Sequence, residues 1–263
     1  MHNLPGFGAS STTQTEWGLK VRRGEIPGLS ILTKFGRNPE IDVVDGFEDV
    51  WNGGGAYTGF NATAAETVEV SSSGANGEDD TSTGTGARTL RLIGLDASFN
   101  EQTEDVILNG LTPVDTVNQY LRIDRAIVLT AGSGATNAGE LTIRQKTTTA
   151  NVFCQLPSGI NQTLICCYTV PAGKTAYLLS GFVALAKKGN QSSEVKLLKR
   201  SVGGVFTVMQ WQAVSSNGSS YMPCANVAPS AGLGAGTDIK VSANTDTNNT
   251  GISAQLEFLL VDD

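Results

Sequence analysis

Hydrophobic and polar positions alternate along the C-terminal part of the chain. Ile239, Val241 and Ala243 occupy every second position of residues 237–244, with polar residues between them. Residues 252–260 repeat the pattern, and their apolar set is Ile252, Ala254, Leu256, Phe258 and Leu260. Because successive side chains of a strand point to opposite faces, this alternation predicts half-buried antiparallel strands.

Shorter segments of the same kind recur from about residue 61 onward. They predict strands at residues 89–93, 104–108, 120–129, 141–144, 151–155, 163–170, 176–186, 194–199 and 205–213. Turn residues such as Asn109-Gly110 and Gly203-Gly204 separate them, and the chain lacks the helix-period segments that parallel crossovers require. We therefore predict an all-β protein with antiparallel β-sandwiches of jelly-roll type, divided into a β-rich domain at 61–150 and a sandwich at 151–263.

The first sixty residues lack a sustained period. Residues 1–60 are therefore predicted to form an extended N-terminal docking arm, with one short helix over residues 41–51 ended by the glycine run at 53–55. On this view, removing residues 1–55 leaves a folded oligomer that has lost its docking element.

Composition and charge exclude several classes of protein. The chain has 18 Lys and Arg against 25 Asp and Glu, and the resulting net charge of −7 disfavours binding to nucleic acid. Its apolar stretches are too short to span a bilayer, and no signal-peptide pattern opens the chain, so we expect a product made in the cytoplasm without a membrane partner. In that setting the four cysteines, Cys154, Cys166, Cys167 and Cys224, are expected to be buried free thiols.

Candidate chemistry is scarce. His2 is the only histidine, which disfavours a catalytic triad and most transition-metal sites. The acidic runs at 78–80 and 101–105 are interpreted as solvated loops, although a calcium ion there, or a hydrolase with paired carboxylates, stays an alternative. We predict no enzyme, with no catalytic residue, no cofactor and no metal.

Two surface features receive structural interpretations. A basic concentration is interpreted as a solvated rim, and it consists of Lys187, Lys188, Lys196, Lys199 and Arg200. Trp211 shares a strand face with Met209 and Ala213, so it is expected in a core or in a subunit interface.

Several runs of residues resemble a family of tailed-bacteriophage virion structural proteins of marine phage type. They include Gly24-Glu25-Ile26-Pro27-Gly28, Lys34-Phe35-Gly36-Arg37-Asn38-Pro39, Phe47-Glu48-Asp49-Val50-Trp51, Gly84-Thr85-Gly86-Ala87-Arg88-Thr89, Thr130-Ala131-Gly132-Ser133-Gly134 and Val170-Pro171-Ala172-Gly173-Lys174-Thr175. The resemblance follows nearly the whole chain in order. It implies a structural component of a phage particle without an enzymatic role.

The expected function is therefore assembly. We expect a self-associating capsid decoration or cement protein, a homotrimer located in the virion, that docks on the major capsid protein or another virion protein. The alternative is a tail, neck or fibre component whose jelly roll binds a host surface glycan. That alternative predicts exposed aromatic loops near Tyr57, Phe60 or Tyr221.

Overall fold

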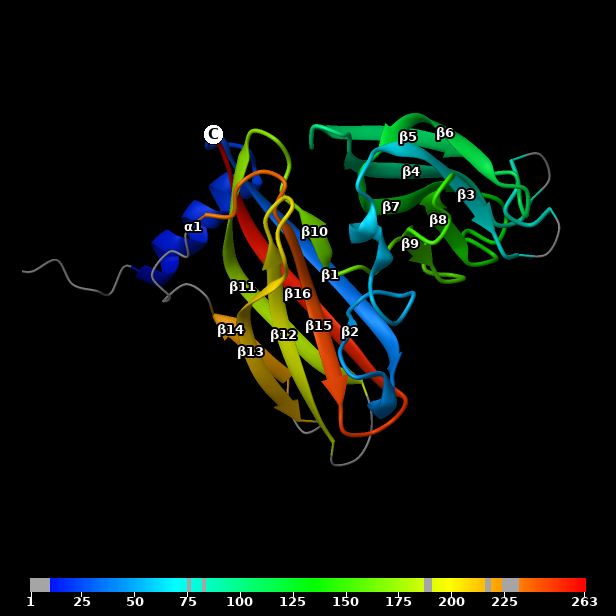
Figure 1. Cartoon of the computed structure of the whole chain (residues 1–263). Coiled ribbons are helices and arrows are strands. Elements are labelled where there is room, and N and C mark those ends of the chain that lie inside the picture. Colours follow the sequence, from blue (N-terminus) through cyan, green and yellow to red (C-terminus); the bar gives the residue numbers. More distant parts are fainter. Residues whose placement is uncertain (1–9, 75–76, 82–83, 187–190, 216–218, 224–231) are drawn as a thin grey trace, which may run out of the picture.

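The computed structural model describes residues 10–74, 77–81, 84–186, 191–215, 219–223 and 232–263. Within these ranges the regular structure is almost entirely antiparallel strand, so the predicted all-β class is confirmed. The strands form two sandwiches, and the second sandwich is inserted into the first (Figure 1).

The larger sandwich has the strand order of a jelly roll. Its strands are β1 (Leu29–Ile41), β10 (Cys167–Thr169), β11 (Lys174–Ala186), β12 (Ser192–Arg200), β13 (Thr207–Ser215), β14 (Ser219–Pro223), β15 (Asp238–Thr245) and β16 (Thr250–Asp262). One sheet has the order β1-β16-β11-β14, and the other has the order β10-β15-β12-β13. Taken along the chain, the first strand pairs with the last, the second with the seventh, the third with the sixth and the fourth with the fifth. These nested pairs define a jelly roll.

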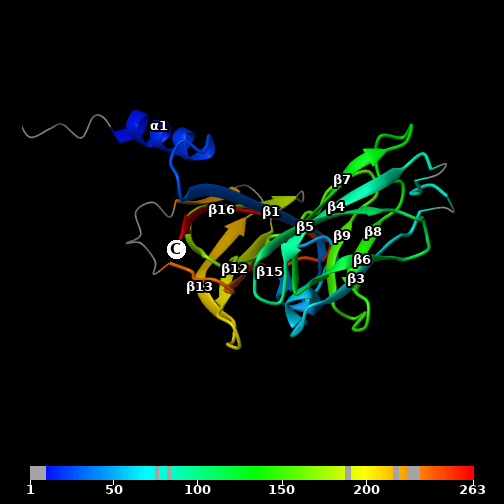
Figure 2. The same cartoon turned by 90° about the horizontal axis from the view of Figure 1, so that it is seen from above.

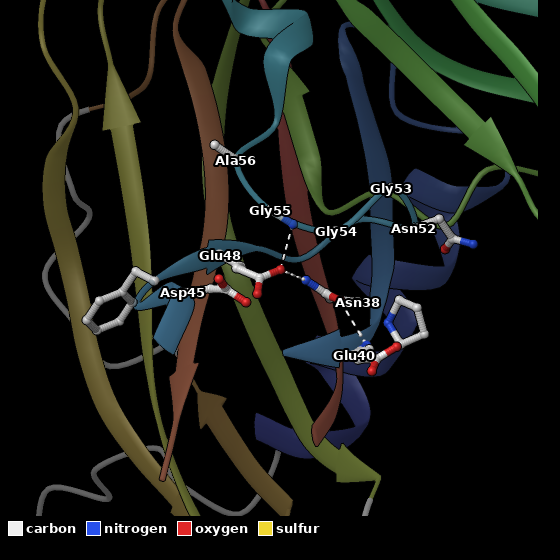
Figure 3. A pocket seen from close by; sticks show the side chains of 11 residues that line it. Asn38, Glu40, Asp45, Glu48, Asn52, Gly53, Gly54, Gly55 and Ala56 are labelled. Atoms are coloured by element: carbon white, nitrogen blue, oxygen red, sulfur yellow. Dashed lines mark hydrogen bonds between the residues drawn. The ribbon is translucent and has the colours of Figure 1, made fainter. Parts of the chain in front are cut away.

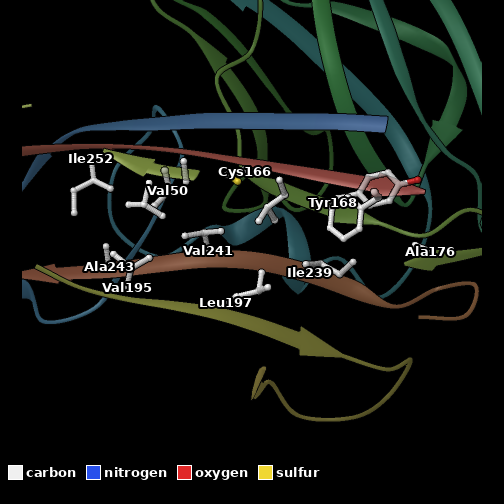
Figure 4. Close-up of a cluster of buried hydrophobic side chains, with 14 of the residues drawn as sticks. Val50, Cys166, Tyr168, Ala176, Val195, Leu197, Ile239, Val241, Ala243 and Ile252 are labelled. Carbon is white, nitrogen blue, oxygen red and sulfur yellow. The ribbon is translucent and has the colours of Figure 1, made fainter. Parts of the chain in front are cut away.

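The core of the jelly roll lies between its two sheets (Figure 4). The inward positions of β16 are the apolar set predicted from the sequence, and Phe258 is fully buried. Ile239, Val241 and Ala243 of β15 face them from the other sheet. Alternation therefore predicted the inward faces of these two strands correctly.

The second sandwich lies between β1 and β10 in the sequence. Its strands are β3 (Glu66–Ser72), β4 (Ala87–Leu95), β5 (Glu101–Ile107), β6 (Val114–Tyr120), β7 (Arg122–Ala131), β8 (Leu141–Gln145) and β9 (Val152–Leu156). The sheets β6-β3-β8-β9 and β5-β4-β7 enclose a separate core that includes Leu90, Leu92 and Phe153. We call this unit the inserted sandwich.

The predicted arm over residues 1–60 is wrong for β1. Leu29–Ile41 pairs with β16 along its length and closes the jelly roll. Its inward positions include Lys34, Gly36 and Asn38, all buried, and these residues break the apolar alternation that marks the other strands. Residues 10–22 form the helix α1 (Ser10–Arg22), and residues 1–9 lie outside the described ranges.

The predicted helix over residues 41–51 is also wrong. The segment forms a short 3-10 turn, η2 (Val43–Asp45), and the two-residue strand β2 (Glu48–Asp49), which pairs with β15; a second 3-10 turn, η3 (Thr58–Asn61), follows. Asp49 is buried and accepts hydrogen bonds from Ser242, from Lys240 Nζ at 2.8 Å and from the Tyr57 amide at 2.7 Å. These side-chain contacts and the backbone pairing with β15 hold the segment at the edge of the second sheet.

Asp79 joins the loops at one end of the inserted sandwich. Its carboxylate accepts from the Ser72 hydroxyl at 2.5 Å and from the amides of Ala87, Ala138 and Gly139 at 2.6, 2.8 and 2.8 Å. Asp79 is fully buried, so the interpretation of 78–80 as a solvated loop is wrong at its central residue. A carboxylate can occupy this place because three amides and a hydroxyl replace its water.

Candidate interaction surfaces

Strand β13 is a free edge of the jelly roll. It ends the strand order of its sheet, so one side of its backbone has no partner strand in the described part of the chain. Its outer side chains are exposed, with Val208 at 49% and Trp211 at 56%, and the preceding loop exposes Val205 at 79%. An edge strand with exposed apolar side chains is a surface on which another chain can pair.

Trp211 is held in place by two neighbours. Phe47 meets its ring edge to face, with 6.0 Å between the ring centroids. Lys196 Nζ lies 3.5 Å from the Phe47 centroid and 3.9 Å from the Trp211 centroid, which is cation–π geometry. We call these three residues the Trp211 cluster. Lys196 is therefore part of an aromatic cluster rather than of a solvated rim, and Trp211 is not a core residue.

Helix α1 is a second exposed surface. It contacts β1, and its last turn is fixed to the outer face of the first sheet by the ion pair of Arg22 with Glu257 (Figure 2). Val21 is buried, whereas Trp17 and Leu19 are 38% and 46% exposed. The helix thus presents an aromatic and an aliphatic side chain away from the sandwich.

A cavity of about 680 Å³ lies beside β2 (Figure 3). It contains the carboxylates of Glu40, Asp45 and Glu48. Of the three, Glu48 is buried, and its Oε2 accepts hydrogen bonds from Asn38 Nδ2 at 2.9 Å and from the Gly55 amide at 2.6 Å. The cavity therefore brings three carboxylates together, but the buried Glu48 carboxylate has a structural role, because it holds the glycine run at 53–55 in place.

Asp238 joins the two sandwiches. Its carboxylate accepts hydrogen bonds from Nε and Nη2 of Arg122, at the start of β7, each at 3.1 Å. It also accepts from Nε and Nη2 of Arg200, at the end of β12, at 3.1 and 2.5 Å. Thr169 adds a hydroxyl at 2.6 Å. Two guanidinium groups share one buried carboxylate, and Arg200 is consequently a structural residue rather than part of a solvated rim.

Lys34 and Asp124 form a second contact between the sandwiches. Lys34 donates to the carbonyl oxygen of Asp124 on β7 and is 4% exposed. Burial raises the pKa of Asp124 to about 6, and the Lys34 charge opposes part of that rise. Burial lowers the pKa of Lys34. Each charge is thus desolvated at the junction.

The aromatic residues predicted for glycan binding are not exposed. Tyr57 and Phe60 are each 5% exposed and meet edge to face, with 4.8 Å between their ring centroids, in a small core between the sandwiches. The side chain of Tyr221 lies outside the described residues. The exposed-loop prediction is therefore wrong for Tyr57 and Phe60.

The predicted buried free thiols are confirmed for three of the cysteines. Cys154, Cys166 and Cys167 are buried and unpaired, and burial raises the pKa of Cys166 to about 12. The adjacent Cys166 and Cys167 enter different cores, as expected for neighbours on a strand. Cys224, Lys187, Lys188 and His2 lie outside the described residues.

Two further searches cover only the described ranges. There, no group of three or more His, Cys, Asp or Glu side chains is arranged to hold a metal ion. In the same ranges, we find no helix with the length and apolar character needed to cross a membrane.

The fold and these surfaces define an all-β jelly-roll protein with an inserted sandwich. No family model matches the chain, and no curated protein matches it. Among solved structures, "Structure of infectious bursal disease virus Gt strain" is 11% identical, with 90% of this chain and 74% of that chain covered, at a TM-score of 0.25. "Crystal structure of infectious bursal disease virus VP2 subviral particle" is 9% identical, with 89% and 72% covered, at a TM-score of 0.22. Similarity at this level supports no argument about this chain.

Proposed function

We propose that this chain is a non-enzymatic structural protein of a bacteriophage particle that self-associates through β13. The observation that carries the proposal is the exposed apolar surface of Val208 and the Trp211 cluster on β13, the last strand of its sheet. Aromatic side chains that are already fixed in position lose little freedom on binding, and they are enriched where protein interfaces concentrate their binding energy. The resemblance to phage virion proteins gives the setting. Viral capsid domains often use jelly rolls, an analogy at the level of fold alone.

The docking element in this proposal is shorter than the sequence predicted. Because β1 belongs to the jelly roll, only the segment before residue 29 is available to reach the capsid or another virion protein. Trp17 and Leu19 of α1 supply apolar contacts for such a partner. We place the protein on the capsid as a decoration or cement protein.

Oligomeric state tests the proposal directly. We expect the full chain to sediment as a trimer, and Trp211→Asp to give a folded monomer because a buried charge opposes the interface. Val117→Asp is the matched control, since Val117 is 90% exposed on the inserted sandwich, away from β13. A monomeric parent chain, or an unchanged oligomer in Trp211→Asp, would contradict the proposal.

Docking is tested separately. Removal of residues 1–24 leaves β1 intact, so the shortened protein should stay folded and oligomeric. It should no longer co-sediment with phage particles that were assembled without this protein. Undiminished particle binding by the shortened protein would show that α1 is not the docking element.

A further inference from the structure

A second cavity opens at the junction of the two sandwiches. Its volume is about 350 Å³, within the range of small-ligand pockets. The inserted sandwich and the segment leading to it contribute Phe60, Thr63, Phe99 and Leu121, and the jelly roll contributes Val202, Gly203 and Gly236. The cavity therefore depends on how the two sandwiches meet.

The charges in the cavity do not balance. Arg122, Arg200 and Asp238 are the ionisable residues in its lining, so two positive groups face one negative group. Asp238 already accepts five hydrogen bonds, from the two arginines and Thr169. Asp124, outside the lining, also interacts with Arg122, so the positive charge in the lining that lacks a carboxylate of its own is that of Arg200. A partly buried charge of this kind favours an anion.

Arg200 is the group that can receive that anion. Its Nε and Nη2 are used by Asp238 and by the Phe60 carbonyl, whereas its Nη1 has no hydrogen-bond partner in the described part of the chain. The side chain is 22% exposed, compared with 8% for Arg122. Phe60 and Phe206 lie against the guanidinium, with centroids 5.7 and 4.6 Å from Cζ. The aromatic rings fix the direction of the free N–H groups.

The walls of the cavity specify the rest of the ligand. Phe99, Leu121 and Val202 offer apolar contacts, and Gly236 packs tightly against Val202, because a Cβ there would lie 2.5 Å from Val202 Cγ2. A single excess positive charge matches a monoanion, whereas a doubly charged phosphate or sulfate would leave a negative excess. Guanidinium and carboxylate are complementary in shape and charge.

We propose that this junction cavity binds a small carboxylate ligand, with the carboxylate on Arg200 Nη1 and its body against the apolar lining residues Leu121 and Val202. Either an acidic sugar or the C-terminal carboxylate of a peptide offers this chemistry. Because both sandwiches line the cavity, the ligand also strengthens their junction. The inference does not depend on the proposed function.

The test is a titration of the full chain at constant ionic strength, followed by calorimetry and by the thermal unfolding midpoint. The probes are sodium glucuronate for the sugar and N-acetylalanine for the peptide terminus, with glucose and sodium chloride as controls. We expect saturable binding of at least one carboxylate and none of glucose. The stronger of the two carboxylates identifies the source of the ligand.

Two variants make the test specific. Val202→Trp fills the mouth of the cavity without touching Asp238 and should weaken carboxylate binding by about tenfold or more, the effect of one lost contact. Val117→Trp, at a 90% exposed position of the inserted sandwich outside the lining, should bind as the parent does. Arg200→Lys keeps the charge but loses the planar donor and should also weaken binding. No saturable binding of either carboxylate, an equal response to chloride, or equal binding by Val202→Trp would overturn the proposal.

Discussion

Asp238 and Asp79 are both buried aspartates, but they stabilise different regions of the molecule. Asp238 lies at the junction, and its partners are two arginines that come from different sandwiches. Asp79 lies within the inserted sandwich, and its partners are backbone amides and one hydroxyl. The junction therefore depends on charge pairing, whereas the loops depend on hydrogen bonds to a carboxylate. Removing the Asp238 carboxylate should therefore destabilise the whole molecule, whereas removing the Asp79 carboxylate should affect mainly the loops around it.

The largest effect is expected from Asp238→Asn. The change leaves Arg122 buried without a full counter-charge and should lower the free energy of unfolding by about 3–5 kcal/mol. Urea denaturation followed by circular dichroism measures this loss. Asp246→Asn is the control, because the Asp246 carboxylate is exposed and accepts hydrogen bonds from Ser192 and Thr247 but from no charged group. Equal losses in the two variants would rule out a special role for the junction.

Gly36→Ala tests whether residues 29–41 are a jelly-roll strand rather than an arm. A Cβ at 36 would lie 2.5 Å from the Val50 oxygen and 2.8 Å from the Ile165 carbonyl carbon. Overpacking against backbone should cost about 2–3 kcal/mol in the same urea experiment. Gly18→Ala in α1 meets open space and should be neutral or slightly stabilising. A neutral Gly36→Ala would mean that β1 is not packed as the structure shows.

Asp79→Asn should have a smaller and more local effect. The side-chain NH2 group of the new asparagine would face one or two of the N–H groups that now donate to the carboxylate. This lowers the free energy of unfolding by about 2 kcal/mol. Hydrogen exchange should become faster at the amides of Ala87, Ala138 and Gly139 and stay unchanged in β15. Loss of protection in both sandwiches would show that the loops and the junction are one cooperative unit.

The smallest effect concerns pH and Asp124. Because its folded pKa of about 6 lies above the usual value of 3.8, the folded protein holds this proton more tightly than the unfolded chain does. This contribution to stability is fully present below about pH 4 and is lost as pH rises through 6, by on the order of 1 kcal/mol after solvent screening. Asp124→Asn should flatten the dependence of unfolding free energy on pH between 4 and 7. An unchanged pH profile in that variant would assign the dependence to other groups.

The sequence predicted the fold class because most strands keep the apolar alternation. It missed β1 because Lys34, Gly36 and Asn38 occupy inward positions there and face the junction and the covering segment instead of an apolar core. It predicted one strand over 120–129, whereas the chain turns at Leu121 and enters the other sheet. Neither β1 nor the change of sheet at Leu121 can be recognised from the neighbouring sequence, because both depend on contacts with distant segments.

The candidate surfaces were predictable only in part. Trp211 was expected on one strand face with Met209, but Met209 packs against the core and Trp211 is exposed beside Phe47, which comes from the segment that was expected to be helical. Asp79 and Asp238 could not be distinguished from solvated carboxylates, since burial depends on how loops far apart in the sequence meet. Gly86 links the loops around Asp79 through its amide and its carbonyl, and a Cβ there would overlap Asp79 Oδ1.

We propose that copies of this chain associate through β13 on a phage particle. Electron cryomicroscopy of the particle, at a resolution that traces strands, can test this proposal. We expect symmetry-related copies in contact across β13 and Trp211, with α1 against the underlying virion protein and the inserted sandwich outward. Copies that do not touch, or that leave β13 facing solvent, would contradict it.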